Sequence, residues 1–353
     1  MKRSFVASAV AAVLVLALTG CVESGRGDRS RALGPALDCP VAPNDGVTGA
    51  VRIGYQNIAN GDLIVKDTGL LETCLPEAKI TWSKFDSGAT VIQAFGAGSL
   101  DLGLLGSAAA ARAISAPLNL DVRAIWIHDV IGPAESLIVK DPAITTVAGL
   151  RGKKIAVPFA STSHYSLLAA LHAAGIEHDV TLVNLQPDAI LAAWKDSGVD
   201  AAFIWDPTLG ELRRGGHVVN SAADTAAAGA PTFDLEGARS DFVAANPAFL
   251  TVWTAVQNWA VHQLISDPQG AATHVAAQLG TDVDAARRQL AGYTYPDAAT
   301  QAGPAYLGGQ LGADLRSTAQ FLLGQGQIQG LAAPRRYHDA VYAQAAATVG
   351  GAR

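Results

Sequence analysis

The chain has 353 residues, of which 50% are hydrophobic and 16% charged, so it can fill a packed interior and general disorder is excluded. This length allows two lobes of ordinary domain size, because single cores usually stop growing below about 300 residues. The formal net charge of -6 argues against nucleic acid and anionic membrane surfaces as partners, although a small anion can still bind through local dipoles.

The N-terminal segment has the pattern of a bacterial export signal. Two basic residues at positions 2–3 precede an apolar stretch, residues 5–18, which is short for a membrane span. The sequence Leu-Thr-Gly-Cys that ends at Cys21 resembles the lipobox of bacterial lipoproteins, whose cysteine is acylated. We predict a lipoprotein signal peptide over residues 1–20 and an exported protein, anchored to the outer face of the cell membrane by lipid on Cys21. A plain signal peptide followed by a chance cysteine is the alternative.

Residues 21–46 are rich in glycine, proline and charged residues, which is the composition of a flexible tether. With Cys21 assigned to lipid, Cys39 and Cys74 remain, and an exported compartment permits them to pair. We expect a disulfide that pins the end of the tether to the first helix of the body. Two buried free thiols are the alternative.

From Val51 onward, short apolar runs alternate with helical patterns, which is typical of parallel sheets with crossover helices. The first series predicts strands at Ala50–Tyr55, Lys79–Phe85, Asp101–Leu105 and Val122–Ile127, and helices at Leu63–Glu72, Thr90–Gly98 and Ser107–Ile114. The second series predicts strands at Lys154–Pro158, Val180–Asn184 and Ala201–Trp205, and helices at His164–Ala174 and Pro187–Lys195. Each series describes one α/β lobe.

Two segments connect the predicted lobes. Glu135–Lys140 leads from the first lobe into the second, and Thr232–Arg239 returns, so two crossings imply a hinge. We therefore predict an α/β protein in which residues 47–134 plus 240–353 form lobe 1 and residues 135–239 form lobe 2.

The C-terminal part consists of amphipathic helices, predicted at Pro247–Ile265, Pro268–Leu279 and Leu311–Leu323. Within the first of these, Trp253, Val256, Trp259 and Ala260 recur at helical spacing, which predicts a stripe that faces the core. We expect a helical C-terminal extension packed against lobe 1.

In open α/β sheets, ligands bind beyond the carboxyl ends of the strands, so the cleft between two such lobes is the expected site. Gln56 follows the opening strand, Asp86 and Ser87 follow the second, and Gly106 and Ser107 follow the third. A small pair such as Gly106-Ser107 lets a ligand approach backbone N–H groups closely. Helix capping alone is the alternative role for Asp86 and Ser87.

The richest strand end is the run Pro-Phe-Ala-Ser-Thr-Ser-His-Tyr at 158–165. Its three hydroxyl residues exceed what capping requires, and a helix N-terminus carries about half a positive charge that favours an anion. Ser161, Thr162, His164 and Tyr165 are therefore candidate ligand contacts. The same hydroxyl and N–H groups could also bind a neutral polar ligand.

Acidic and aromatic residues at the other strand ends would suit a cation. Trp205 can make a cation–π contact and Asp206 can supply charge, while a capping aspartate beside a core tryptophan is the alternative. Glu135 and Asp234 stand at the two crossings. Together with the hydroxyl-rich helix starts, these residues predict a cleft for a small zwitterion.

Several runs of the chain resemble the taurine-binding periplasmic proteins. They are Phe-Asp-Ser-Gly-Ala at 85–89, Gly-Ser at 106–107, the stretch 154–171, Val-Asn-Leu-Gln-Pro at 183–187 and Gly-Ala-Pro-Thr at 229–232. The matching covers roughly Val51 to Leu323, and binders of aliphatic sulfonates and nitrate are similar more loosely. The long tether, the two cysteines Cys39 and Cys74, and the run Glu236-Gly237-Ala238 depart from the pattern.

The resemblance implies a type II periplasmic-binding-protein fold that closes on its ligand and docks on an ABC permease with its ATPase. Our hypothesis is that Ser107, Ser161, Thr162 and backbone N–H groups hold a sulfonate, and that Asp206, with Glu135 or Asp234 assisting, holds an ammonium group. A general sulfonate or nitrate binder, and a sensor module of the same fold, are the alternatives.

Catalysis is not expected, because the chain has no Gly-x-Ser-x-Gly elbow and no histidine pair at metal-binding helical spacing with a nearby glutamate. We accordingly expect no cofactor and no metal, and we expect a monomer.

Overall fold

The computed structural model of the protein describes residues 37–351. The predicted signal peptide, Cys21 and the tether up to residue 36 lie outside these residues.

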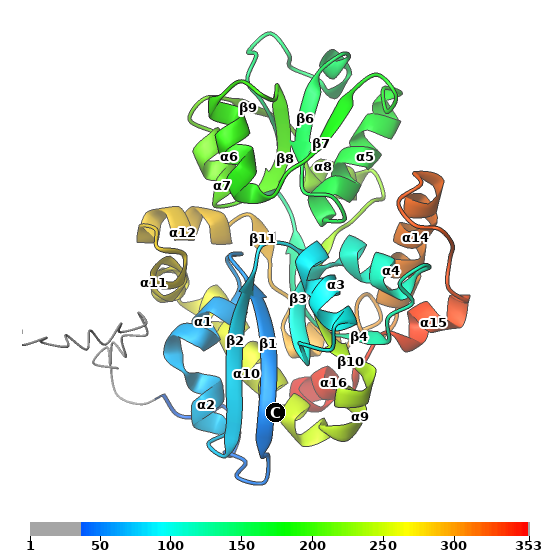
Figure 1. Cartoon of the computed structure of the whole chain (residues 1–353). Helices are drawn as coiled ribbons and strands as arrows, with labels where there is room; N and C mark the ends of the chain where they lie inside the picture. The colour runs from blue at the N-terminus through cyan, green and yellow to red at the C-terminus, as the bar shows by residue number, and fades with distance from the viewer. Residues whose placement is uncertain (1–36, 352–353) are drawn as a thin grey trace, which may run out of the picture. The chain divides into compact units, whose positions relative to one another are not determined.

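The described chain contains two mixed β-sheets, with strand orders β11-β4-β10-β3-β1-β2 and β7-β6-β8-β5-β9 (Figure 1). The strands are β1 (Gly49–Gln56), β2 (Ala78–Phe85), β3 (Leu102–Gly106), β4 (Val122–Ile131), β5 (Glu135–Val139), β6 (Lys154–Val157), β7 (Thr181–Asn184), β8 (Ala201–Trp205), β9 (His217–Ser221), β10 (Phe233–Arg239) and β11 (Tyr293–Thr294). The helices are α1 (Gly61–Thr68), α2 (Leu70–Cys74), α3 (Gly88–Gly96), α4 (Ser107–Ile114), the 3₁₀ turn η1 (Val147–Leu150), α5 (Thr162–Ala174), α6 (Pro187–Lys195), α7 (Thr208–Leu212), α8 (Ala222–Ala227), α9 (Ser240–Ala245), α10 (Pro247–Ser266), α11 (Pro268–Leu279), α12 (Val283–Leu290), α13 (Ala298–Gln301), α14 (Leu311–Gly324), α15 (Pro334–Asp339) and α16 (Gln344–Gly351). The predicted α/β class is confirmed. The sequence does not predict several shorter elements, such as β9, β11 and α7.

Strand direction differs in part from the prediction of parallel sheets. β1 pairs in parallel with β2 and β3, and β6 pairs in parallel with β7 and β8, as expected. The two crossing segments are antiparallel to their neighbours: β10 to β3 and β4, and β5 to β8 and β9. A segment that enters a sheet from the other lobe, without a crossover helix on the same sheet, can run antiparallel to the strands already there.

The position of β10 corrects the expected boundary of the second lobe. The sequence assigns residues 135–239 to one lobe, but β10 lies between β3 and β4 in the first sheet. Six of its seven residues are buried, as befits a central strand. At Gly237 a side chain has little room, because a Cβ there would lie 2.6 Å from Leu105 Cδ2. Apolar patterning cannot tell which sheet a buried strand joins, which explains the error.

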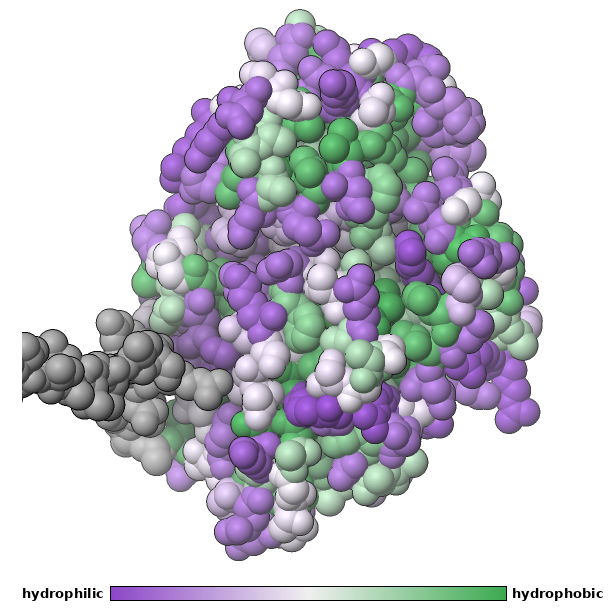
Figure 2. Space-filling view, viewed as in Figure 1, coloured by the Kyte–Doolittle hydropathy of each residue, from purple (hydrophilic) through white to green (hydrophobic). Residues whose placement is uncertain are grey.

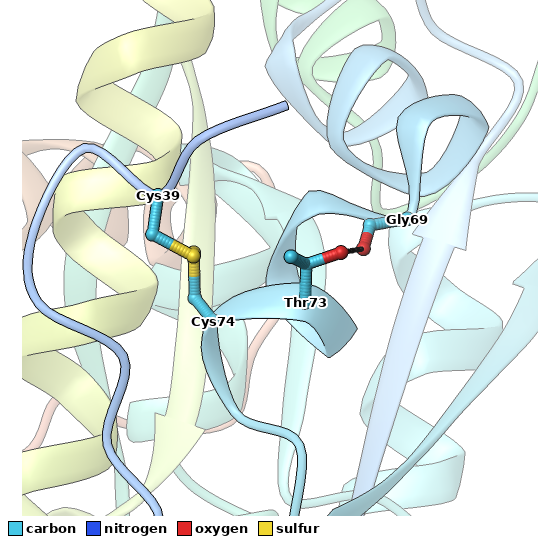
Figure 3. The surroundings of a disulfide bond; sticks show 4 residues. All are labelled: Cys39, Gly69, Thr73 and Cys74. Atoms are coloured by element: carbon cyan, nitrogen blue, oxygen red, sulfur yellow. Dashed lines mark hydrogen bonds between the residues drawn. A yellow bond between two sulfur atoms is a disulfide. The ribbon is translucent and has the colours of Figure 1, made fainter. Parts of the chain in front are cut away.

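The first helix is divided by a glycine and fixed by a disulfide. The sequence predicts one helix at Leu63–Glu72, but Gly69 is left-handed, with φ of 65°, and separates α1 from α2. Cys74 at the end of α2 forms a disulfide with Cys39, with 5.5 Å between their Cα atoms (Figure 3). Next to it, Thr73 Oγ1 donates a hydrogen bond of 3.0 Å to the carbonyl of Gly69. The disulfide thus ties the segment before β1 to the helices of the first lobe.

The C-terminal helices pack on the first sheet and also contact the second lobe. Trp253, Val256 and Ala260 of α10 are fully buried in the core that contains β1 and β3, as the predicted stripe requires, whereas Trp259 is only partly buried against the same core. Phe321 of α14 packs edge-on against Tyr165 of α5, with 5.2 Å between ring centroids. The C-terminal helices therefore contact both lobes, whereas the sequence predicts contact with lobe 1 alone.

Among residues 37–351, no helix has both the length and the apolar character that crossing a bilayer requires. The face of the described body in Figure 2 mixes hydrophilic and hydrophobic residues. The large hydrophobic side chains that are exposed belong to separate segments: Leu37, Leu118, Val218, Ile265, Leu323 and Leu331.

Replacing Gly237 with alanine should lower the free energy of unfolding by about 1–3 kcal/mol, because the added methyl group overpacks the core at Leu105. Gly324→Ala, at the end of α14 with open space around its Cα, is the matched control and should be neutral or slightly stabilising. Urea unfolding measures both variants. A Gly237→Ala variant as stable as the parent would contradict this packing of β10.

Candidate ligand-binding site

Three helices begin around one small pocket between the two sheets. Gly88 is the first residue of α3, Gly106 is the N-cap of α4, and Ser161 is the N-cap of α5. The lining of the pocket consists of Gln56, Ile58, Gly88, Gly106, Glu135, Ser161, Thr162, Trp205 and Asp234. Because the first N–H groups of a helix have no partner inside it, three helix starts give this pocket an electropositive wall suited to an anion.

The close approach of α4 and α5 depends on a glycine. A Cβ at Gly106 would lie 2.5 Å from Thr162 Cγ2, which is too close for two non-bonded carbon atoms. Gly106 therefore lets the N-terminus of α4, in the first lobe, face that of α5, in the second.

The loop before α5 is ordered by its own hydrogen bonds. Ser161 Oγ accepts from the backbone N–H of His164 at 3.0 Å and donates to the carbonyl of Pro158 at 2.7 Å. Ala160 adopts a left-handed conformation, with φ of 64°, which is uncommon for a residue with a side chain. The hydroxyl of Ser161 is thus already engaged in capping, and the backbone N–H groups of the first turn are what α5 offers to a ligand.

The opposite wall of the pocket is acidic. Thr162 Oγ1 donates to Glu135 Oε1 at 2.6 Å, while Glu135 Oε2 is buried and has no hydrogen-bond partner among residues 37–351. Asp234 Oδ2 is also buried and also lacks a hydrogen-bond partner within the described chain. Burial, and then the charge of Asp234, raises the pKa of Glu135 to about 8; burial raises the pKa of Asp234 to about 7. Each acid thus keeps one buried oxygen, Oε2 of Glu135 and Oδ2 of Asp234, without a hydrogen-bond donor among residues 37–351.

A third carboxylate, which the sequence analysis does not single out, stands beside them. Asp129 of β4 is paired in register with Asp234 of β10, and both of its carboxylate oxygens are buried without a side-chain partner in the described chain. Burial, followed by the charges of Asp234 and Glu135, raises its pKa well above the usual value. The sequence signal that could have identified it is the polar pair His128-Asp129, which directly follows the predicted strand Val122–Ile127.

The remaining wall combines an amide, an aliphatic side chain and an indole. Gln56 Nε2 donates to the carbonyl of Leu104 at 2.9 Å, which holds the amide in the pocket wall. Trp205 ends β8 and lines both this pocket and a neighbouring one. The neighbouring pocket also contains the predicted Asp86, with Asn57, Lys84, Phe85, Gln186, Pro187, Asp188, Pro207 and Thr208.

Two predicted contacts lie elsewhere in the structure. Asp206 Oδ1 accepts from the backbone N–H of Gly210 at 2.8 Å, at the start of α7, and the residue lines a different pocket with Arg213. Ser107 Oγ accepts from the N–H of Phe233 at 3.2 Å and so holds the start of β10. Asp206 therefore satisfies a backbone N–H in α7, as a polar residue beside a helix start commonly does, and Ser107 joins the start of α4 to β10.

Three further candidates do not line the pocket of Glu135 and Asp234. Tyr165 packs against Phe321, and His164 stacks on Phe159 with 4.4 Å between ring centroids. Burial, and then the charge of Arg112, lowers the pKa of His164 to about 4, so its imidazole is neutral. Ser87 caps α3, and its buried hydroxyl has no partner within residues 37–351.

Two α/β sheets that meet at a small polar pocket have the architecture of a two-lobed binding protein. The OpuAC family model, described as the substrate binding domain of ABC-type glycine betaine transport system, matches residues 49–278. The taurine-binding periplasmic protein of Escherichia coli (strain K12) is 35% identical over 262 residues, which cover 72% of this chain and 80% of that protein. The chain belongs to the family of substrate-binding proteins of ABC transporters, as the sequence resemblance indicates.

Solved structures agree with this assignment. The periplasmic aliphatic sulphonate binding protein SsuA from Escherichia coli has a TM-score of 0.67 and 28% identity, covering 84% of this chain and 99% of that one. The alkanesulfonate-binding protein SsuA from Xanthomonas axonopodis pv. citri, bound to MOPS, has a TM-score of 0.68 and 25% identity, covering 86% and 99%. The predicted two-lobed binding-protein fold is confirmed.

The raised pKa of Glu135 makes stability depend on pH. The folded state holds the Glu135 proton more tightly than the unfolded state, whose pKa is near 4.5, so the free energy of unfolding should fall as the pH rises from about 4.5 to about 8. One such group contributes a slope of at most about 1.4 kcal/mol per pH unit. Glu135→Gln should make the measured slope shallower in ligand-free protein.

Glu77→Gln is the control for this experiment, because Glu77 is exposed in the turn before β2. Its pH profile in urea unfolding should match that of the parent. A Glu135→Gln profile as steep as the parent's would show that Glu135 is not a buried, proton-holding group.

Proposed function

We propose that this protein is the extracytoplasmic solute-binding component of an ABC importer and that its ligand is a small zwitterion, with taurine as the expected compound. One observation carries the proposal: a small pocket has three helix N-termini on one wall and the buried carboxylates of Glu135 and Asp234 on the other, each with one oxygen that has no hydrogen-bond partner within residues 37–351. The anionic group binds to the helix starts, and the ammonium group binds to the carboxylates.

The names of its relatives support a sulfonate as the anionic group, since the similar proteins include a taurine-binding and two sulfonate-binding ones. The pocket lining contains one aromatic residue, Trp205. A quaternary ammonium ligand such as glycine betaine is usually held by a cage of several aromatic rings, whereas a primary ammonium can donate hydrogen bonds to carboxylates. The pocket therefore favours taurine over glycine betaine.

In this proposal Glu135 and Asp234 bind the ammonium group, a role that the sequence analysis expects of Asp206.

Taurine has about seven non-hydrogen atoms, and the best very small ligands reach about 1.5 kcal/mol per atom, so a binding free energy near -10 kcal/mol is the limit. This limit corresponds to a dissociation constant no lower than tens of nanomolar, so picomolar binding is not expected.

The wider proposal includes export, lipidation at Cys21 and docking of the ligand-bound monomer on the permease with its ATPase. The two lobes correspond to the two sheets, with residues 233–239 moved to the first lobe, and they close on the ligand. A general sulfonate or nitrate binder, or a sensor module that does not transport, is the alternative. Nothing in the pocket calls for catalysis.

Calorimetry with taurine, ethanesulfonate, glycine betaine and nitrate tests the ligand. Taurine should bind at least 100-fold more tightly than ethanesulfonate, because without an ammonium group the buried carboxylates stay unpaired. Glu135→Gln should weaken taurine binding by about 100-fold or more and change ethanesulfonate binding little.

Asp206→Asn is the matched control and should alter taurine affinity much less than Glu135→Gln, because Asp206 is bonded to Gly210 outside the pocket. Equal affinity of the parent for taurine and ethanesulfonate would replace the zwitterion by a general sulfonate. Binding of none of the four compounds would refute the ligand class.

A further inference from the structure

A second buried polar cluster lies in the first lobe and takes no part in the proposed ligand pocket. Asp62 stands in the first turn of α1, His128 in β4 and Glu236 in β10, elements that can be followed in Figure 1. The exposed fractions of these three residues are 0%, 1% and 0%. Ionisable groups are rarely buried to this extent unless they are paired or hold a metal ion.

The three side chains converge on one point. His128 Nε2 lies 3.0 Å from Glu236 Oε2 and 3.6 Å from Asp62 Oδ2, and one ligand atom from each residue lies within 4.8 Å of the others. In a tetrahedral zinc site, with metal–ligand bonds of about 2.0–2.2 Å, neighbouring ligand atoms are about 3.4 Å apart. The observed distances are close to this spacing, and the 3.0 Å pair would have to widen by about 0.4 Å to admit an ion.

The cluster lacks a compensating cation. Within residues 37–351, the ion pairs of Asp62 and Glu236 are those with His128, and neither acid contacts lysine or arginine. Asp62 Oδ2 and Glu236 Oε1 are buried without a hydrogen-bond partner in the same part of the chain. If both acids are ionised, they and a neutral imidazole carry a charge of -2, which a bound divalent cation would neutralise.

Neighbouring residues hold the three side chains in this arrangement. Gln257 Nε2 of α10 donates to Asp62 Oδ1 at 2.7 Å, which leaves Oδ2 directed at the histidine. Trp253 packs edge-on against the His128 ring, with 6.3 Å between centroids. The register of β4 with β10 skips His128, passing from Ile127 to Asp129, and such a bulge re-aims a side chain. Metal ligands are commonly oriented by outer residues in this way.

We propose that Asp62, His128 and Glu236 form a binding site for a divalent transition metal, with zinc as the favoured ion. One imidazole and two carboxylates are a ligand set that zinc accepts. The ion would join α1, β4 and β10 behind the ligand pocket and so stabilise the first lobe. The site differs from the helical histidine pairs that a sequence search recognises, because its ligands come from three distant segments.

The test begins with purified protein that has been dialysed against a chelator and then titrated with zinc. We expect about one zinc per chain by mass spectrometry of the metal, and a higher melting temperature with zinc than with chelator. Zinc X-ray absorption should show one imidazole nitrogen with oxygen neighbours and no sulfur. No zinc uptake, together with a melting temperature that zinc leaves unchanged, would overturn the proposal.

Variants locate the metal. Glu236→Gln and His128→Gln should each lose the bound zinc and the zinc-dependent rise in melting temperature. His274→Gln is the matched control, because it alters the more exposed pair with Asp67, at 2.8 Å, and should still bind about one zinc. If His128→Gln does not fold, Glu236→Gln decides, since it preserves the shape of the side chain; full zinc uptake by Glu236→Gln would place the ion elsewhere.

Discussion

Both polar sites depend on the insertion of β10 between β3 and β4. This strand returns from the second sheet and pairs antiparallel with two strands of the first, which buries Asp234 and Glu236 in the interior of the sheet. Burying carboxylates costs free energy unless a cation or hydrogen-bond donors compensate. Two carboxylates of β10 therefore need a compensating cation or hydrogen-bond donor. Asp234 lies at the ligand pocket, and Glu236 lies near α1.

Around the ligand pocket, groups that favour a negative charge lie close to groups that favour a positive charge. The helix starts at Gly88, Gly106 and Ser161 favour negative charge, while Glu135, Asp234 and Asp129 favour positive charge. A zwitterion meets both preferences at once, whereas a simple anion leaves the carboxylates unpaired. In the proposed function, selectivity would arise from the cost of leaving buried groups unsatisfied more than from the strength of any one contact.

The segments that cross between the sheets also bring the ligand groups together. Glu135 begins β5 directly after the first crossing, and Thr162 of the second lobe donates to it. Asp234 lies just after the return crossing. A pocket built at the crossings contains groups from both lobes, so ligand contacts there can favour a closed arrangement of a two-lobed protein.

The sequence by itself determined the features that depend on neighbouring residues. Strand ends, helix starts such as Ser161, the apolar stripe of Trp253 and Val256, and the resemblance to binding proteins could all be predicted, because local patterns and caps specify them. Gln56, Gly106, Glu135, Ser161, Thr162, Trp205 and Asp234 were among the expected site residues and do line one pocket.

Only the tertiary structure decided which carboxylates share that pocket. Asp206 and Asp234 follow similar local patterns, yet Asp206 caps α7 while Asp234 lies opposite Asp129. The same holds for Asp62, His128 and Glu236, which meet although the first and last are far apart in the chain. Which distant strands pair, and in which register, follows from the packing of the whole core, and no local pattern encodes it.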